Sequence, residues 1–260
     1  SSFPRLRETT LIHLEHNVGC AQGYNLAAQY AVRRGADFLF LLNNDTVVVN
    51  PDILSNMIGT ARQFPEAVAI GPKIYDWKQS KAEPDVIQFI GGRFIGGILG
   101  AHQKDHGQFD QVRKVDFLSG AAMLVRAAAI KEIGLFDPRF FVYLEELDFA
   151  ARAKRAGHEL VYTPDGQVRH KGRNSIGERY GPYAEQSTRN YMVLIRLHSG
   201  IQGLQFAIRA VTVIGKSIAG SIMVKHEPRK LKGIITAMGE GLRLKLKETN
   251  EELTLHCVKY

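Results

Sequence analysis

The chain has 260 residues, of which 45% are hydrophobic and 23% charged, so it can bury a sizeable core and is neither disordered nor fibrous. Lys and Arg outnumber Asp and Glu by 34 to 26, and the net charge of +8 suggests anionic partners such as nucleotides, nucleic acid or an acidic membrane face. The two cysteines, Cys20 and Cys257, lie near opposite ends of the chain. No disulfide framework is therefore predicted, and a reducing compartment is favoured.

Strand and helix patterns alternate over the first two-thirds of the sequence. Strands are predicted at Leu11–Leu14, 38–42, 47–49, Val68–Ile74, Val115–Val125, Glu159–Tyr162 and Gln167–His170, the last two flanking a Pro164-Asp165-Gly166 turn. Helices are predicted from about Leu26 to Gly35, from Pro51 to Phe64, over Ala127–Ile133 and over Glu145–Ala156. Glycine-rich residues 91–107 are expected to form a loop or an irregular hairpin. This order favours an α/β fold with a mainly parallel sheet flanked by helices.

The final quarter of the chain differs from the rest in charge and in pattern. Residues 201–260 carry 10 Lys and Arg against 5 Asp and Glu, and strand signals disappear from Ala184 onward. A helix expected over Leu204–Ile222 has an apolar stripe and two charges, which argues against a membrane span. It suits either an interfacial helix or a helical lid packed on the main domain. We therefore expect a main domain at 1–183 and a basic, amphipathic helical region at 184–260.

This basic region predicts peripheral contact with the anionic inner face of the cytoplasmic membrane. Nucleic acid is a weaker expectation, because no groove-reading or RNA-stacking motif accompanies the charge. We therefore expect a cytoplasmic protein without a nucleic-acid partner.

The first candidate site follows the apolar strand FLFLL, which ends in Asn43-Asn44-Asp45. A strand that stops in polar residues places them at the carboxyl edge of an open sheet, where α/β proteins bind ligands. Asp45 is a candidate ligand for Mg²⁺ or Mn²⁺ bridging two phosphates, since these cations prefer hard oxygen ligands. The alternative is a turn capped by Asn or Asp, which is common after any strand.

The second candidate site is the helix start that contains Glu145, Glu146 and Asp148. The helix dipole alone favours acidic residues there, so a solvated first turn is the alternative interpretation. Aromatic residues crowd the preceding segment, however, at Phe136, Phe140, Phe141 and Tyr143. An apolar pocket of this kind raises the pKa of a carboxyl group toward the working range of a general base.

Two weaker candidates complete the pattern. His170, followed by Ser175, comes after a strand, and its imidazole together with Asp45 would make a mixed oxygen and nitrogen metal site, although a lone histidine is more often structural. Asn17, Gly19, Gly23 and Asn25 lie between a strand and a helix, where backbone can approach an anion.

The order and spacing of these four motifs are more specific than any one of them. In this combination the sequence resembles the family 2 glycosyltransferases, especially the bacterial rhamnosyltransferase-like branch, which has the GT-A fold. The matching segments are HNVGCAQGYNLAAQYAVRRGADFLFLLNNDTVV, FLSGAAMLVRAAAIKEIGLFDPRFFVYLEELDFAARAKRAGHELVYTP and VRHKGRNS, within roughly residues 11–198. The fold that this resemblance implies is an α/β, GT-A-like, Rossmann-like mixed and mainly parallel sheet with a C-terminal helical appendage.

The resemblance also implies a role for each motif. Asp45 stands at the family's Asp-x-Asp motif and would hold a divalent cation, with His170 completing the metal site. Glu146 would be the catalytic base, while Glu145 and Asp148 would support acceptor and loop geometry. The residues that it places around the donor are Asn17, Gly19, Asn25, Asn43, Asn44, Ser119, Gly120 and Ala121.

The implied activity is single displacement with inversion, transferring a sugar from a nucleotide-sugar donor to a glycan or lipid-linked acceptor with Mg²⁺ or Mn²⁺ as cofactor. Two residues depart from the family pattern, since Asn43 replaces the first acid of Asp-x-Asp and Glu146 replaces the usual Asp. Family members begin with a strand, helix and strand that do not precede Ser1 in this sequence, so the domain is expected to be N-terminally incomplete.

Two other functions compete with transfer. A non-catalytic module that binds a nucleotide-sugar or carbohydrate needs no base, so the acidic triplet favours an enzyme. A metal-dependent phosphoesterase would use the same acids and histidine, but it would usually need more ligands than Asp45 and His170 provide.

Overall fold

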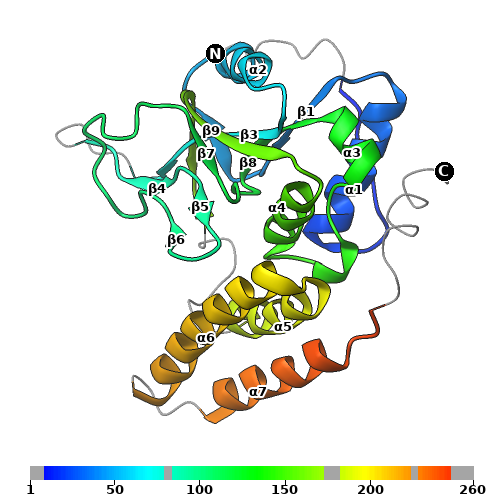
Figure 1. The fold of residues 1–260 in the computed structure, drawn as a ribbon, viewed down its shortest axis with the longest axis vertical. Coiled ribbons are helices and arrows are strands. Elements are labelled where there is room, and N and C mark those ends of the chain that lie inside the picture. Colours follow the sequence, from blue (N-terminus) through cyan, green and yellow to red (C-terminus); the bar gives the residue numbers. More distant parts are fainter. Residues whose placement is uncertain (1–8, 79–83, 173–181, 224–227, 247–260) are drawn as a thin grey trace.

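The computed structural model describes residues 9–78, 84–172, 182–223 and 228–246, and the chain forms a sheet with helices packed around it (Figure 1). The helices are α1 (Gly19–Arg33), α2 (Ile53–Gln63), α3 (Ala127–Ile133), α4 (Glu145–Arg155), α5 (Pro182–Leu197), α6 (Gly200–Met223) and α7 (Pro228–Arg243), with a short 3-10 helix η1 at Pro138–Phe140. The strands are β1 (Phe38–Leu42), β2 (Thr46–Val48), β3 (Ala67–Asp76), β4 (Ile87–Phe89), β5 (Gly92–Arg93), β6 (Gly97–Ile98), β7 (Arg113–Val115), β8 (Ala122–Arg126) and β9 (Glu159–His170).

The main sheet is mixed, with the strand order β1-β8-β3-β9-β2, and β4 and β7 pair with β3 and β9 respectively. Strands β1, β3 and β9 run in one direction, but β8 lies between β1 and β3 in the opposite direction. Among the described pairings only β3 with β9 is parallel, so the expectation of mainly parallel strands is wrong for this part of the chain. The expected α/β sheet flanked by helices is confirmed.

Four predicted strands differ from the structure. The segment Leu11–Leu14 forms no strand, and the side chain of Leu11 is 88% exposed, since no neighbouring strand covers it. The predicted strand Val115–Val125 is divided into β7 and β8, because the backbone turns at Ser119-Gly120. The two strands predicted around residue 165 form one strand, β9, whose pairing with β3 shifts register between Thr163 and Gln167. The glycine-rich segment contains the two-stranded β5–β6 hairpin, as expected.

The centre of the core lies at β3, which is buried from Ala67 to Tyr75 because β8 and β9 flank it and helices cover the sheet. Helix α4 is also buried on most of its surface, and Figure 1 shows it between the sheet and the group formed by α5, α6 and α7. Its alanines, Ala150, Ala151 and Ala153, let these layers approach closely.

The C-terminal helices pack against the rest of the fold. The side chain of Gln202 on α6 donates to the carbonyl of Ala151 on α4 at 3.2 Å. The guanidinium of Arg209 donates to the carbonyl of Arg93 and lies 4.9 Å from the ring centroid of Phe117. The division at residue 183 stays a prediction. Among the described residues, none of the helices is both long enough and apolar enough to cross a membrane.

Candidate active site

The structure brings Asp45 and His170 together, although 125 positions separate them in the sequence. Strand β2 pairs antiparallel with the end of β9, so that Thr46 lies opposite His170. The backbone N–H of Lys171 donates to the carbonyl of Asp45 at 3.0 Å and fixes this register. As a result, Nε2 of His170 lies 3.2 Å from Oδ1 of Asp45. The predicted proximity of these two side chains is confirmed.

Gln88 orients the imidazole of His170 from the other side. The amide nitrogen of Gln88 lies 3.3 Å from both Oδ1 of Asp76 and the carbonyl of His170, so its amide oxygen is the atom that faces Nδ1 of the ring, at 2.7 Å. Nδ1 therefore carries a proton. Burial lowers the pKa of His170, which favours the neutral ring with a lone pair on Nε2. Nε2 of the ring and Oδ1 of Asp45 are thus held side by side, so the same two atoms could bind a cation in place of their contact with each other.

The acidic residues begin α4 in a buried environment rather than a solvated first turn. Glu145 is 6% exposed, and its Oε2 has no hydrogen-bond partner within the described structure. Burial, followed by the nearby charge of Glu146, raises the pKa of Glu145 to about 8. Burial also raises the pKa of Glu146. The pair therefore holds a proton more tightly than ordinary glutamates do, as the apolar surroundings predict.

The start of helix α1 lies close enough to both the acidic pair and Asp45 for their charges to act on it. Burial, followed by the charges of Glu145, Glu146 and Asp45, raises the pKa of Cys20 to about 12. One turn later, the hydroxyl of Tyr24 donates to the amide oxygen of Asn43 at 2.7 Å. The charges of the acidic pair and of Asp45 thus act on the same face of α1.

The segment Ser119-Gly120-Ala121 lies beside both parts of this cluster. A Cβ on Gly120 would be 4.0 Å from Oε1 of Glu145, and the carbonyl of Ala121 accepts from the backbone of Asn43 at 2.9 Å. The hydroxyl of Ser119 accepts from the N–H of Ala121 at 3.2 Å, which closes a tight turn. The structure therefore brings these three residues next to Asn43 and Glu145; their role at a donor stays a prediction.

Three other predicted donor residues, Asn17, Gly19 and Asn25, have structural contacts at the start of α1 and within it. Asn17 accepts from the backbone N–H of Gly19 at 2.9 Å, and Gly19 has φ of +82° at the start of α1. A Cβ there would lie 2.5 Å from Phe141, so the close approach requires glycine. Both ends of the Asn25 amide bind the backbone of Phe136, at 2.7 and 3.0 Å, so its side chain joins α1 to the segment before α4 rather than facing a ligand.

Asp148 lies in a closed buried network. Its carboxylate pairs with Arg152 at 2.8 Å and with Nε2 of His198 at 2.9 Å. Despite its burial, the positive charge of Arg152 and the hydrogen bond from His198 hold the pKa of Asp148 well below its usual range. Both oxygens are occupied, so the contacts suit support of the loop geometry rather than proton transfer. Ser175 lies outside the described residues.

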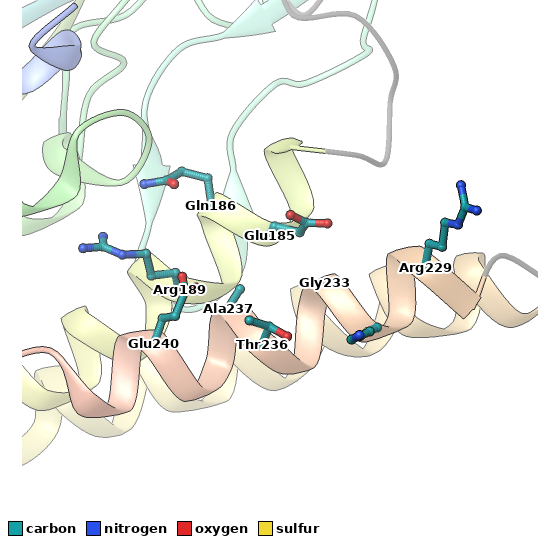
Figure 2. A pocket seen from close by; sticks show the side chains of 9 residues that line it. Glu185, Gln186, Arg189, Arg229, Gly233, Thr236, Ala237 and Glu240 are labelled. Atoms are coloured by element: carbon teal, nitrogen blue, oxygen red, sulfur yellow. The ribbon is translucent and has the colours of Figure 1, made fainter.

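Sequence reasoning missed Gln88, because it follows no recognisable motif and its contact with His170 is made between distant segments. It also missed the contacts that α5 makes with the loop before α4. A cavity of about 440 Å³ lies between α5 and α7, and its lining residues include Gln186 and Arg189 (Figure 2). The side chains of Gln186 and Arg189 also donate to the carbonyls of Phe140 and Arg139, at 3.2 and 2.8 Å. Two residues that line the cavity therefore also contact the segment before α4.

Comparison with known proteins identifies the family. Residues 6–192 match the family described as "Glycosyltransferase like family 2", and the chain belongs to that family. The family membership that the sequence resemblance predicts is therefore confirmed.

Two curated relatives have related names. The chain is 30% identical over 176 residues to an N-acetylglucosaminyl-diphospho-decaprenol L-rhamnosyltransferase of Mycobacterium tuberculosis, covering 59% of this chain and 56% of the relative. It is 27% identical over 149 residues to the low-salt glycan biosynthesis hexosyltransferase Agl10 of Haloferax volcanii, covering 54% and 44% respectively. The chain thus spans about half the length of these relatives.

A solved structure shares the fold. The crystal structure of residues 1–349 of TarS from S. aureus aligns with a TM-score of 0.51 at 12% identity, covering 88% of this chain and 63% of that one. The GT-A-like fold class expected from the resemblance is confirmed by this likeness, with a mixed sheet in place of a mainly parallel one.

Proposed function

We propose that this protein is an inverting, metal-dependent glycosyltransferase that moves a sugar from a nucleotide-sugar donor to a glycan or lipid-linked acceptor. The observation that carries the proposal is the contact of Oδ1 of Asp45 with Nε2 of His170, at 3.2 Å, in the same fold as the buried Glu145 and the half-buried Glu146. Family membership and the names of the two relatives support the same reaction class.

The donor set at Asp45 and His170 fits Mn²⁺ or Mg²⁺. A carboxylate oxygen and a neutral imidazole nitrogen are both competent ligands, and Gln88 fixes the ring as outer-sphere partners of metal-bound histidines do. Among the described residues no group of three or more His, Cys, Asp and Glu could hold a metal, so a donor diphosphate would complete the coordination. When bound, the cation offsets the negative charge of the departing nucleoside diphosphate.

Glu146 is the proposed base. Its carboxylate takes the proton of the acceptor hydroxyl while the hydroxyl oxygen forms a bond to the anomeric carbon. The bond between that carbon and the diphosphate oxygen breaks, and its electron pair leaves with the nucleoside diphosphate. Attack opposite the leaving group inverts the anomeric centre. Glu145, protonated near neutral pH by its raised pKa, can hold a hydrogen bond to a sugar hydroxyl.

The two alternatives fit the geometry less well. A carbohydrate-binding module has no use for two adjacent glutamates, one buried and one half-buried, whose pKa values are raised. A two-metal phosphoesterase requires more ligands than the two side chains that meet here.

We further propose that α6 and α7 contact the anionic inner face of the cytoplasmic membrane, where a lipid-linked acceptor would lie. Helix α6 exposes an apolar stripe at Ile201, Leu204, Ile208 and Val211, which are 45–75% exposed. Helix α7 exposes Ile235, Leu242 and the cations Arg229, Lys232 and Arg243. Apolar residues flanked by cations match the polarity of an acidic bilayer surface.

Metal and nucleotide binding tests the proposed function. Isothermal titration of the protein with a panel of nucleoside diphosphates, in Mn²⁺ and in EDTA, should detect binding that depends on the metal. Asp45→Asn should remove this dependence, whereas Asp52→Asn should preserve it, because Asp52 is an exposed residue before α2. Identical curves in Mn²⁺ and EDTA would refute the metal-dependent site.

A further inference from the structure

The backbone that leads into the acidic helix α4 has an unusual conformation. Phe141, Tyr143 and Leu144 have φ values of +53°, +70° and +69°. None of them is glycine, so each adopts a region that side chains rarely occupy. Such conformations persist only where the surrounding structure holds them, and they cluster at functional sites. Here the segment ends directly at Glu145.

One side chain from α5 holds this segment. Asn190 is fully buried, and its amide nitrogen donates to the carbonyls of Phe140, Val142 and Tyr143, at 3.0, 2.9 and 2.6 Å. An amide has two hydrogens, so at least one is shared between two of these carbonyls. A single residue therefore satisfies three of the backbone acceptors that lead into α4.

The neighbours of Asn190 on α5 fix the direction of its amide. Its oxygen accepts from Arg189 at 2.7 Å and lies 3.3 Å from the amide nitrogen of Gln186, which leaves the nitrogen facing the loop. Arg189 and Gln186 also donate to the carbonyls of Arg139 and Phe140. In Figure 2 both side chains extend from α5 away from α7, as this arrangement requires.

We infer that Asn190 is a positioning residue for sugar transfer, which holds the strained segment before α4 and thereby aims Glu145 and Glu146 at the acceptor. The inference rests on the proposed function, because it needs Glu146 as the base. It makes α5 part of the catalytic machinery rather than an appendage. Asn190 itself touches no reacting atom.

Replacement of Asn190 tests the inference through a split between turnover and binding. Asn190→Ala should lower kcat on the order of 10²-fold, because a displacement of about 1 Å at reacting groups has that effect. Affinity for a nucleoside diphosphate in Mn²⁺ should stay within twofold, since the Asp45 site is untouched. Asn56→Ala is a matched control, because the side chain of Asn56 on α2 donates to the carbonyl of Asp165 on β9 at 2.9 Å. It should leave kcat unchanged.

Hydrogen–deuterium exchange provides a readout that does not depend on activity. Peptides covering residues 140–147 should exchange faster in Asn190→Ala than in Asn56→Ala. Gln186→Ala removes the contacts of Gln186 with Phe140 and with the amide oxygen of Asn190 but keeps Asn190 itself. It is therefore the second variant if Asn190→Ala does not fold, and it should give a smaller change in the same direction. Unchanged exchange, or faster exchange with unchanged kcat, would overturn the inference. If Glu146→Gln stays active while exchange increases in Asn190→Ala, the proposed base is wrong and the restraint on the loop stands.

Discussion

Glu145 should make the stability of the protein fall as the pH rises. Its pKa is raised by burial from an ordinary 4.5 to about 8, so the folded state binds a proton that the unfolded state releases between these pH values. The resulting stability is complete below about pH 4.5 and is lost as the pH rises toward 8. At 1.36 kcal/mol for each pKa unit, the loss reaches on the order of 5 kcal/mol.

The variant Glu145→Gln isolates this contribution, since glutamine keeps the shape of the side chain and cannot ionise. Urea unfolding followed by circular dichroism, at pH 5 and at pH 8.5, gives the free energy of unfolding of both proteins. We expect the variant to gain several kcal/mol relative to the parent between the two pH values. Glu66→Gln, at an exposed glutamate, should follow the parent. Parallel pH dependences of the parent and Glu145→Gln would refute the buried state of Glu145.

Three further predictions concern other parts of the molecule. Gln88→Leu should weaken Mn²⁺ binding 10–100-fold, as measured by electron paramagnetic resonance, whereas Gln103→Leu, at an exposed glutamine, should leave it unchanged. Equal Mn²⁺ affinities of Gln88→Leu and the parent protein would contradict the orienting role of Gln88. Asp148→Asn should destabilise the fold by about 3–5 kcal/mol in urea unfolding, because its buried arginine partner loses its counter-charge, and a loss below 1 kcal/mol would argue against the network. Val211→Glu, in the apolar stripe of α6, should reduce co-sedimentation with phosphatidylserine vesicles at low salt more than Thr212→Glu does. If the parent protein does not bind the vesicles, membrane contact is excluded.

Local signals in the sequence predict much of the site. The apolar strand followed by Asn43-Asn44-Asp45 and the acidic start of α4 both rely on short-range patterns, and the structure has β1 and α4 at nearly the predicted bounds. The aromatic residues that precede Glu145 in the sequence predict a raised pKa, and burial does raise the pKa of Glu145. The pairing of Asp45 with His170 is suggested only by their ligand chemistry and by the family resemblance, because their proximity depends on the register between β2 and β9.

Long-range features could not be predicted in the same way. Strand β8 lies between β1 and β3 and runs in the opposite direction to both. The hydrophobic pattern of a single strand does not indicate which strand will pair with it. Gln88 and Asn190 are ordinary polar residues until the fold brings them to His170 and to the loop before α4. The burial of Asn190 on α5 would indicate its role, but the sequence does not show which face of that helix is buried.

The most direct test of the account is the turnover of Glu146→Gln measured beside its donor binding. A glutamine at this position keeps the size of the side chain and cannot accept the acceptor's proton. We expect kcat to fall about 10²- to 10⁴-fold, while the affinity for a nucleoside diphosphate in Mn²⁺ is unchanged. Turnover equal to that of the parent protein would contradict the assignment of Glu146 as the base.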